Sequence, residues 1–150
     1  MRRSARVLGV VAVVVAALAL SFVPATAVAP VAGATYKGQV AHAPDSENAV
    51  AFKVSKHAGW VTDLTVGPYP MSLSCGSGGD APDQSSAAAR IRSGKFTAHV
   101  VYSSSGGDVV ARATVTGTFL RKGAEKGVVT TQIVGFPDCH FSRPYTAQAQ

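Results

Sequence analysis

The sequence predicts a secreted all-β domain, either an antiparallel β-sandwich or a partly closed β-barrel of about eight or nine strands, with one disulfide. Three observations support this prediction. Short segments of alternating apolar and polar residues follow one another along the chain, as in strands with one buried face. Turns rich in Gly, Pro and Ser separate these segments. The N-terminus has the layout of an export signal.

The N-terminal segment resembles a secretory signal peptide. Three arginines precede the uncharged segment Val7–Leu20, and small residues follow up to Ala27. An apolar core of this length is shorter than the roughly 20 residues needed to span a bilayer. We therefore predict a signal peptide over 1–27, with cleavage after Ala34 as the alternative, and a flexible leader over 28–34. The mature chain is then extracellular and has no membrane span.

Removal of the signal leaves about 120 residues, a common size for one domain, and we place that domain at 35–148. The signal contains three of the 14 Lys and Arg residues, so 11 remain against 8 Asp and Glu, a net charge of +3 rather than +6. Only Arg121 and Lys122 are adjacent among the basic residues that remain. The sequence therefore predicts no nucleic-acid partner.

The first half of the domain contains several strand-like segments. In the third of them we expect Trp60, Leu64 and Val66 to share one face, with Val61 on the other. In the fourth, Cys75 lies on an apolar face. The last segment could also form one helical turn, and we favour a strand because a hairpin turn follows it. The expected strands are 36–41, 49–55, 60–66, 69–75 and 87–91.

The second half is expected to form an antiparallel meander. Its two hairpin loops are Ser103–Asp108 and Arg121–Lys126, which are polar and contain glycine. A last short strand starts at Cys139 and is expected to be interrupted at Pro144, because proline cannot donate a backbone hydrogen bond. The three meander strands are expected at 96–102, 109–119 and 127–134.

Two cysteines are present, Cys75 and Cys139. An even count in an exported chain predicts a disulfide between them. Closing the long loop between Cys75 and Cys139 would stabilise the fold by roughly 4 kcal/mol. Two free thiols or a metal-binding pair are the alternatives, although the chain has no CxxC spacing.

The sequence contains no motif that predicts a metal site or a catalytic nucleophile. No pair of histidines has the HxH or HExxH spacing, so we predict no cofactor. The serine in Gly76–Asp80 does not match the G-x-S-x-G motif. The carboxylate pairs Asp45/Glu47 and Asp80/Asp83 are interpreted as turn residues, with Ca²⁺ ligation as an alternative. The histidines are His42, His57, His99 and His140.

Aromatic side chains could stack on a sugar ring or a peptide. The chain has one tryptophan and no second aromatic residue beside it, so core packing is the favoured interpretation. The residues considered are Tyr36, Trp60, Tyr69, Tyr102 and Tyr145.

The order of several motifs resembles that of small secreted all-β domains of actinobacteria whose function is unknown. The resemblance covers nearly all of the mature chain and implies export and an all-β fold, but no substrate, cofactor or catalytic residue. The motifs are Tyr36-x-Gly38, Val50-x-Phe52-x-Val54, the strand Val61–Val66, Cys75, Ile91–Phe96, Val115-x-Gly117-x-Phe119, a basic glycine-containing turn, and Cys139 followed by Tyr145-x-Ala147.

These observations favour a secreted, non-catalytic binding module whose partner is a cell-surface glycan or another secreted protein. A small secreted enzyme inhibitor or hydrolase is the alternative, with Gly76–Ser86 as the exposed loop that would act. The sequence leaves the question of enzymatic activity open and favours its absence.

Overall fold

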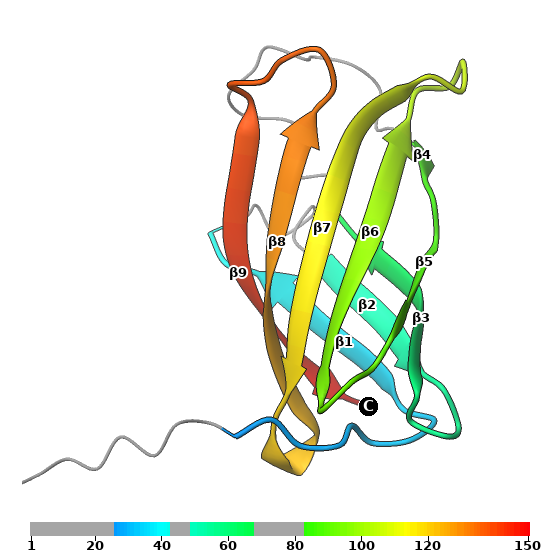
Figure 1. Ribbon diagram of the computed structural model, residues 1–150, viewed down its shortest axis with the longest axis vertical. Coiled ribbons are helices and arrows are strands. Elements are labelled where there is room, and N and C mark those ends of the chain that lie inside the picture. Colours follow the sequence, from blue (N-terminus) through cyan, green and yellow to red (C-terminus); the bar gives the residue numbers. More distant parts are fainter. Residues whose placement is uncertain (1–25, 43–48, 68–82) are drawn as a thin grey trace, which may run out of the picture.

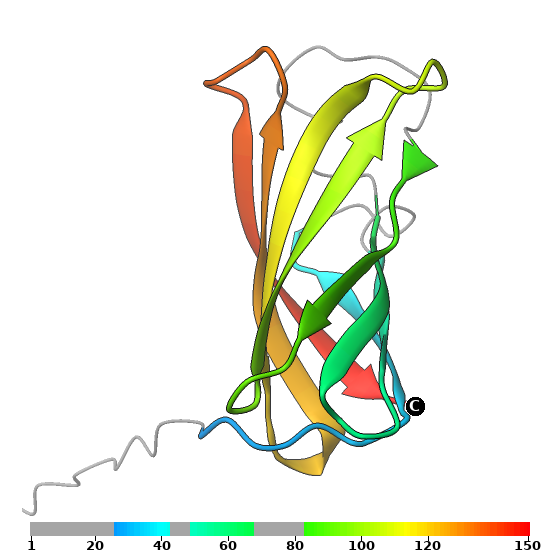
Figure 2. The same cartoon turned by 45° about the vertical axis from the view of Figure 1, so that its right-hand side comes forward.

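The computed structural model describes residues 26–42, 49–67 and 83–150. They form nine strands in one curled antiparallel sheet, a half-barrel, in the order β4-β6-β7-β8-β9-β1-β2-β3-β5 (Figures 1 and 2). The strands are β1 (Thr35–Val40), β2 (Ala49–Val54), β3 (Trp60–Val66), β4 (Asp83–Gln84), β5 (Ala87–Arg90), β6 (Lys95–Ser103), β7 (Val109–Phe119), β8 (Ala124–Ile133) and β9 (His140–Ala149).

The expected all-β class is confirmed. Of the two predicted architectures, the single curled sheet corresponds to the partly closed barrel. The β-sandwich alternative is wrong, because the two edge strands, β4 and β5, are consecutive in the chain. Ser85 and Ser86 alone separate them, so this short segment joins one edge of the sheet to the other. The backbone N–H of Ser85 donates to the carbonyl of Val101 on β6 over 2.9 Å. The sheet therefore has to curl.

The inner face of the sheet forms the core. Its lower end, which carries the β7–β8 turn, holds a cluster of four aromatic rings. Tyr36 and Phe52 stack with their ring centroids 4.9 Å apart, and Phe119 meets Tyr36 edge-on at 5.3 Å. Phe96 completes the cluster, 5.5 Å from Phe52. Each of these rings is at most 4% exposed. Such aromatic pairs stabilise a core beyond the area they bury.

Two side chains connect the edges of the sheet at its upper end. The hydroxyl of Tyr102 on β6 donates to the carbonyl of Val66, the last residue of β3, over 3.3 Å. The side-chain oxygen of Gln84 on β4 accepts a hydrogen bond from the amide of the same Val66, also over 3.3 Å. Both strands at one edge of the sheet are therefore bonded to β3, which lies next to the other edge.

The expected meander is confirmed with small shifts in its bounds. Strand β7 has the expected limits, Val109–Phe119. Strand β8 begins at Ala124, three residues before the expected start, because Phe119 pairs with Glu125 directly after a short 3-10 turn at Arg121–Gly123. Residues 124–126, which the sequence placed in a loop, thus extend a strand.

The predicted position of Trp60 is wrong. Val61, Leu64 and Val66 share the buried face, and Trp60 is 48% exposed. The cause is a β-bulge: two residues of β3 lie opposite one residue of β2, and Asp63 has a φ of 53°. An extra residue in one strand reverses the alternation beyond it. Uninterrupted alternation along 60–66 therefore predicts that Trp60 is on the buried face, whereas the bulge places it on the exposed face.

The predicted interruption at Pro144 is also wrong. Strand β9 continues through this residue, which pairs with Val128 on β8. The carbonyl of Pro144 faces the β1 side, where it accepts from the amide of Ala41 over 2.8 Å. Strand β1 ends at Val40, so no carbonyl of β1 needs the N–H that proline lacks. A proline is tolerated at such a position.

The leader residues 28–34 run along the lower end of the sheet (Figure 1). The amide of Val28 donates to the carbonyl of Phe119 over 2.9 Å, and the amide of Gly33 donates to the carbonyl of Ser55 over 3.2 Å. The amide of Val31 donates to the hydroxyl of Tyr36 over 3.1 Å. This segment therefore bonds with three separate parts of the sheet.

Candidate functional site

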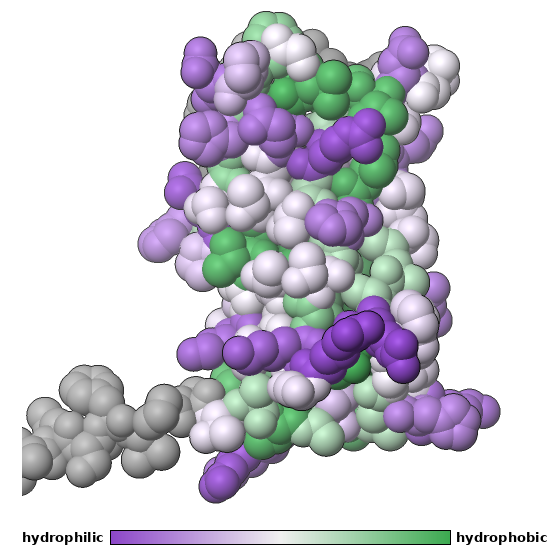
Figure 3. Space-filling view, viewed as in Figure 1, coloured by the Kyte–Doolittle hydropathy of each residue, from purple (hydrophilic) through white to green (hydrophobic). Residues whose placement is uncertain are grey.

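The outward side chains of the four long strands β6 to β9 form a broad surface, here called the polar face. Side chains at alternate positions of a strand point to the same side, and on this side most are hydroxyl or basic residues. Figure 3 shows hydrophilic bands near the upper and lower ends of this face, with a zone of intermediate and hydrophobic residues between them. The hydroxyl residues of the polar face are Thr97, Thr114, Thr116, Thr118, Thr130, Ser142 and Thr146.

Neighbouring polar side chains on this face bond to one another. The hydroxyl of Thr114 lies 3.3 Å from Nδ1 of His99, and the hydroxyls of Thr130 and Ser142 are also 3.3 Å apart. The hydroxyl of Thr116 donates to the carbonyl of Val128 over 3.4 Å. These contacts reduce the rotational freedom of the hydroxyls before any ligand arrives, which lowers the entropic cost of binding.

Basic residues occupy defined rows of the polar face. Lys95 pairs with Thr118, which pairs with Lys126, which in turn pairs with Thr146. Both lysines are exposed and lie in one row that crosses the strands. Arg112 lies higher on β7 and is also exposed.

A shallow groove of about 610 Å³ lies where β8, β9 and β1 meet. The side chains of Lys37, Gln39, Lys126 and Thr146 line it, and all four are exposed hydrogen-bonding groups. Gly38 lies at the base of the groove, and a Cβ placed there would collide with the carbonyl oxygen of Thr146. Glycine thus allows β1 to approach β9 closely at this point.

Gln148 extends the hydrogen-bonding lining of the groove toward the β7–β8 turn. Its side-chain amide donates to the carbonyl of Lys122 over 2.8 Å. Leu120 and Ala124 add apolar surface on the same side. The groove therefore combines apolar surface with several polar groups, the usual composition of a ligand site.

Glu125 lies beneath the groove and is 1% exposed. The hydroxyl of Tyr145 donates to its Oε1 over 2.9 Å, whereas Oε2 has no hydrogen-bond partner. Burial raises the pKa of the Glu125 carboxyl to about 8, and hydrogen bonds from Tyr145 and from the backbone of Thr118 oppose this rise. The carboxyl is therefore mostly protonated at neutral pH.

Sequence reasoning missed both the groove and Glu125. The signal for Glu125 was present in the alternation: counting back from the buried residues Ile133, Thr131 and Val129 in steps of two leads to Gly127 and then to Glu125. The groove has no comparable signal, because its residues come from strands that are distant in the sequence.

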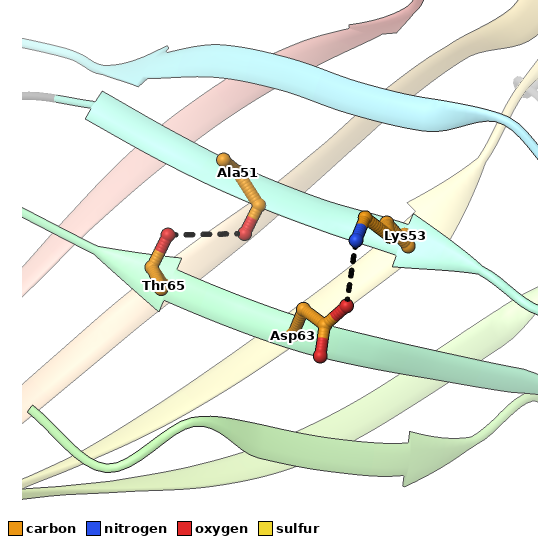
Figure 4. A network of polar contacts seen from close by, with 4 residues as sticks. All are labelled: Ala51, Lys53, Asp63 and Thr65. Carbon is orange, nitrogen blue, oxygen red and sulfur yellow. Dashed lines mark hydrogen bonds and ion pairs between the residues drawn. The ribbon is translucent and has the colours of Figure 1, made fainter.

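The opposite wall of the half-barrel differs in its electrostatics. There the ammonium group of Lys53 on β2 forms an ion pair with Asp63 on β3, with an N–O distance of 3.1 Å (Figure 4). It is the only ion pair among the residues that the structure describes. A hydrogen bond from Thr65 to the carbonyl of Ala51 lies beside it, at 3.4 Å.

The structure does not bring the predicted chemical residues together. All four histidines, His42, His57, His99 and His140, are exposed. Within the described ranges, no group of three or more His, Cys, Asp and Glu side chains could hold a metal ion. Asp83 begins β4, whereas its expected partner Asp80, the pair Asp45/Glu47 and the serine segment Gly76–Asp80 lie outside the described residues.

The aromatic residues divide into two groups. Tyr36, Tyr102 and Tyr145 are buried, as expected for core residues, and Trp60 is not. Tyr69 lies outside the described residues, as does the predicted strand 69–75. Cys75 lies in the same segment, so the predicted Cys75–Cys139 disulfide stays a prediction. Cys139 lies in the β8–β9 turn, where its amide donates to the carbonyl of Phe136 over 2.9 Å.

No protein-family model, curated protein or solved structure matches the chain. In the part of the chain that the structure describes, no helix has the length and apolar character required to cross a membrane.

Proposed function

We propose that the protein is a secreted, non-catalytic binding module that holds a cell-surface glycan in the groove between β8, β9 and β1. One observation supports this function above the others: the groove is lined by exposed ammonium, amide and hydroxyl groups above a base that includes Gly38. Sugars present many hydroxyls, and each can both donate and accept a hydrogen bond. Lys, Gln and Thr side chains supply the matching donors and acceptors.

The polar face extends this site to a length suited to a polymer. Thr146 and Lys126 belong both to the groove and to the polar face, so the two surfaces are continuous. A chain of sugars that leaves the groove would continue over the hydroxyls of β7 and β6. A non-catalytic role is consistent with this surface, because the ligand would lie on an exposed sheet and not in an enclosed cleft.

The test is to fill the groove without changing its charge. Thr146→Trp places a large side chain in the groove, and we expect it to reduce binding to purified cell-wall glycan at least ten-fold in a co-sedimentation assay. Thr65→Trp is the matched control, since Thr65 is an exposed strand threonine on the opposite wall, and it should bind as the original protein does. Equal binding by the two variants, or no glycan binding by the folded domain, would contradict the proposed function.

Export and the disulfide belong to the same proposal, because an extracellular ligand requires a secreted protein. We propose cleavage after Ala27 and a disulfide between Cys75 and Cys139. The intact mass of the protein recovered from culture medium should match a chain that begins at Val28 and lacks two hydrogen atoms. A chain that begins at Thr35 would show that cleavage does not follow Ala27. Two thiols that react with an alkylating reagent without reduction would show that the disulfide is absent.

A further inference from the structure

The groove and its surroundings carry lysines without carboxylate partners. Lys37 and Lys126 line the groove, and Lys95 lies in the same cross-strand row as Lys126. The pair between Lys53 and Asp63 is the only ion pair among the described residues. The positive charge of the three other lysines is therefore not compensated by a contacting carboxylate in this part of the chain.

The exposed side-chain carboxylates of the described residues lie away from the groove. Asp83 begins β4 opposite the end of β6, and Asp108 and Asp138 lie in the loops that follow β6 and β8. Strand β4 and these two loops are at the upper end of the sheet, whereas the β7–β8 turn is at the lower end (Figure 1). The groove lies beside that turn, because Leu120 and Ala124 line it. Asp63, on the opposite wall, is paired with Lys53. The lysines Lys37, Lys95 and Lys126 are thus separated along the sheet from these carboxylates.

The one side-chain carboxyl that lines the groove does not cancel this positive charge. Glu125 is buried beneath the groove, and burial raises its pKa to about 8. At neutral pH it is mostly protonated, so it adds little negative charge under a bound anion. The site therefore attracts anions although an acidic residue lies beside it.

Building on the proposed glycan site, we propose that its ligand is a cell-surface polymer of sugars or polyols joined by phosphodiesters, which lies across the strands with its anionic groups on Lys37, Lys95 and Lys126. Adjacent strands lie roughly 4.8 Å apart, so Lys95 and Lys126, two strands apart, are separated by about 10 Å. A polymer with repeated charges can contact both. The groove presents lysines, and each is a point charge with three donors that can bind a phosphate oxygen from many directions.

The same surface favours a glycan over a nucleic acid. Proteins that bind single-stranded nucleic acids stack the bases on aromatic side chains. The described residues of the polar face include no exposed Phe, Tyr or Trp side chain, and the exposed Trp60 lies on the other wall. Hydroxyl residues such as Thr116, Thr130 and Ser142 instead match a ligand rich in hydroxyl groups.

The experiment measures the affinity of the mature protein for poly(glycerol phosphate) at several salt concentrations. Polygalacturonate, dextran and an oligothymidylate are measured in parallel. We expect poly(glycerol phosphate) to bind most tightly, with a salt dependence that corresponds to about three ionic contacts. Lys37→Gln, Lys95→Gln and Lys126→Gln should each lower the affinity roughly five-fold, a modest effect because the lysines are exposed, and reduce the salt slope by about 1. Lys53→Gln, on the opposite wall, should change neither quantity.

Four outcomes would overturn the inference. If polygalacturonate or dextran binds tightest and Thr146→Trp abolishes that binding, the glycan site stands and the phosphodiester ligand does not. If the oligothymidylate binds as well as poly(glycerol phosphate), the surface recognises nucleic acid. If the three lysine variants bind like the Lys53→Gln control, the anionic groups do not contact these lysines. If the folded protein binds no polymer, both this inference and the proposed function are wrong.

Discussion

Glu125→Gln should make the domain more stable at alkaline pH and should remove a loss of stability that the original protein shows as the pH rises. The carboxyl has an ordinary pKa of 4.5 and a pKa of about 8 in the folded protein. Between these values the folded state holds a proton that the unfolded state has released. Stability therefore falls as the pH rises through this window, by roughly 3 to 5 kcal/mol in total.

The measurement is urea unfolding of both proteins at about pH 5, 7 and 9. Other ionisable groups titrate in both proteins, so the difference in unfolding free energy between them isolates Glu125. That difference should shift in favour of the glutamine variant as the pH rises, because glutamine has a similar shape and no charge. Tyr145→Phe removes the hydroxyl that bonds to the carboxyl and should extend the loss of stability to higher pH. A difference that does not change with pH would show that Glu125 is not buried as an acid.

Gly127→Ala should destabilise the fold by about 3 kcal/mol or more, the upper range for an overpacked core. Gly127 on β8 pairs with Gly117 on β7 and with Tyr145 on β9. A Cβ at this position would collide with the carbonyl oxygen of Thr116 and would lie 2.6 Å from the Tyr145 ring. The backbone carbonyl cannot move without separating β7 from β8, so the substitution strains the centre of the sheet.

Gly106→Ala provides the matched control. Gly106 lies in the exposed β6–β7 loop, and the nearest atom to an added Cβ is the hydroxyl oxygen of Ser104 at 3.7 Å, an ordinary contact distance. Its urea midpoint should stay close to that of the original protein, whereas the midpoint of Gly127→Ala should fall clearly. Equal midpoints for the two variants would show that the sheet tolerates a side chain at Gly127.

Local alternation predicted those strands in which it is uninterrupted. Strand β7 has the predicted limits, Val109–Phe119, and from Ala111 onward its residues alternate between a buried and a polar side. The pattern failed where the backbone departs from the regular strand. At Asp63 a bulge adds one residue and places Trp60 outside. At Pro144 the sequence indicates a break, but the neighbouring strand ends there and the proline is tolerated.

Burial of an acidic residue is a second point at which local rules were insufficient. The segment Arg121–Lys126 is polar and contains glycine, and it therefore predicts a hairpin loop that includes Glu125. In the folded chain Phe119 pairs with Glu125, so the strand starts earlier and the carboxyl points inward toward Tyr145. The partner that makes this burial tolerable is twenty residues away in the sequence and is recognisable only after the strands are paired.

The sequence by itself determined the all-β class and most strand positions, because these depend on the alternation of apolar residues over a few positions. The tertiary structure alone decided that one sheet curls from β4 to β5. It also decided that Lys37 and Lys126 line one groove. Cross-strand pairing brings together residues that no local pattern connects, and for this reason the candidate site could be found only in the folded protein.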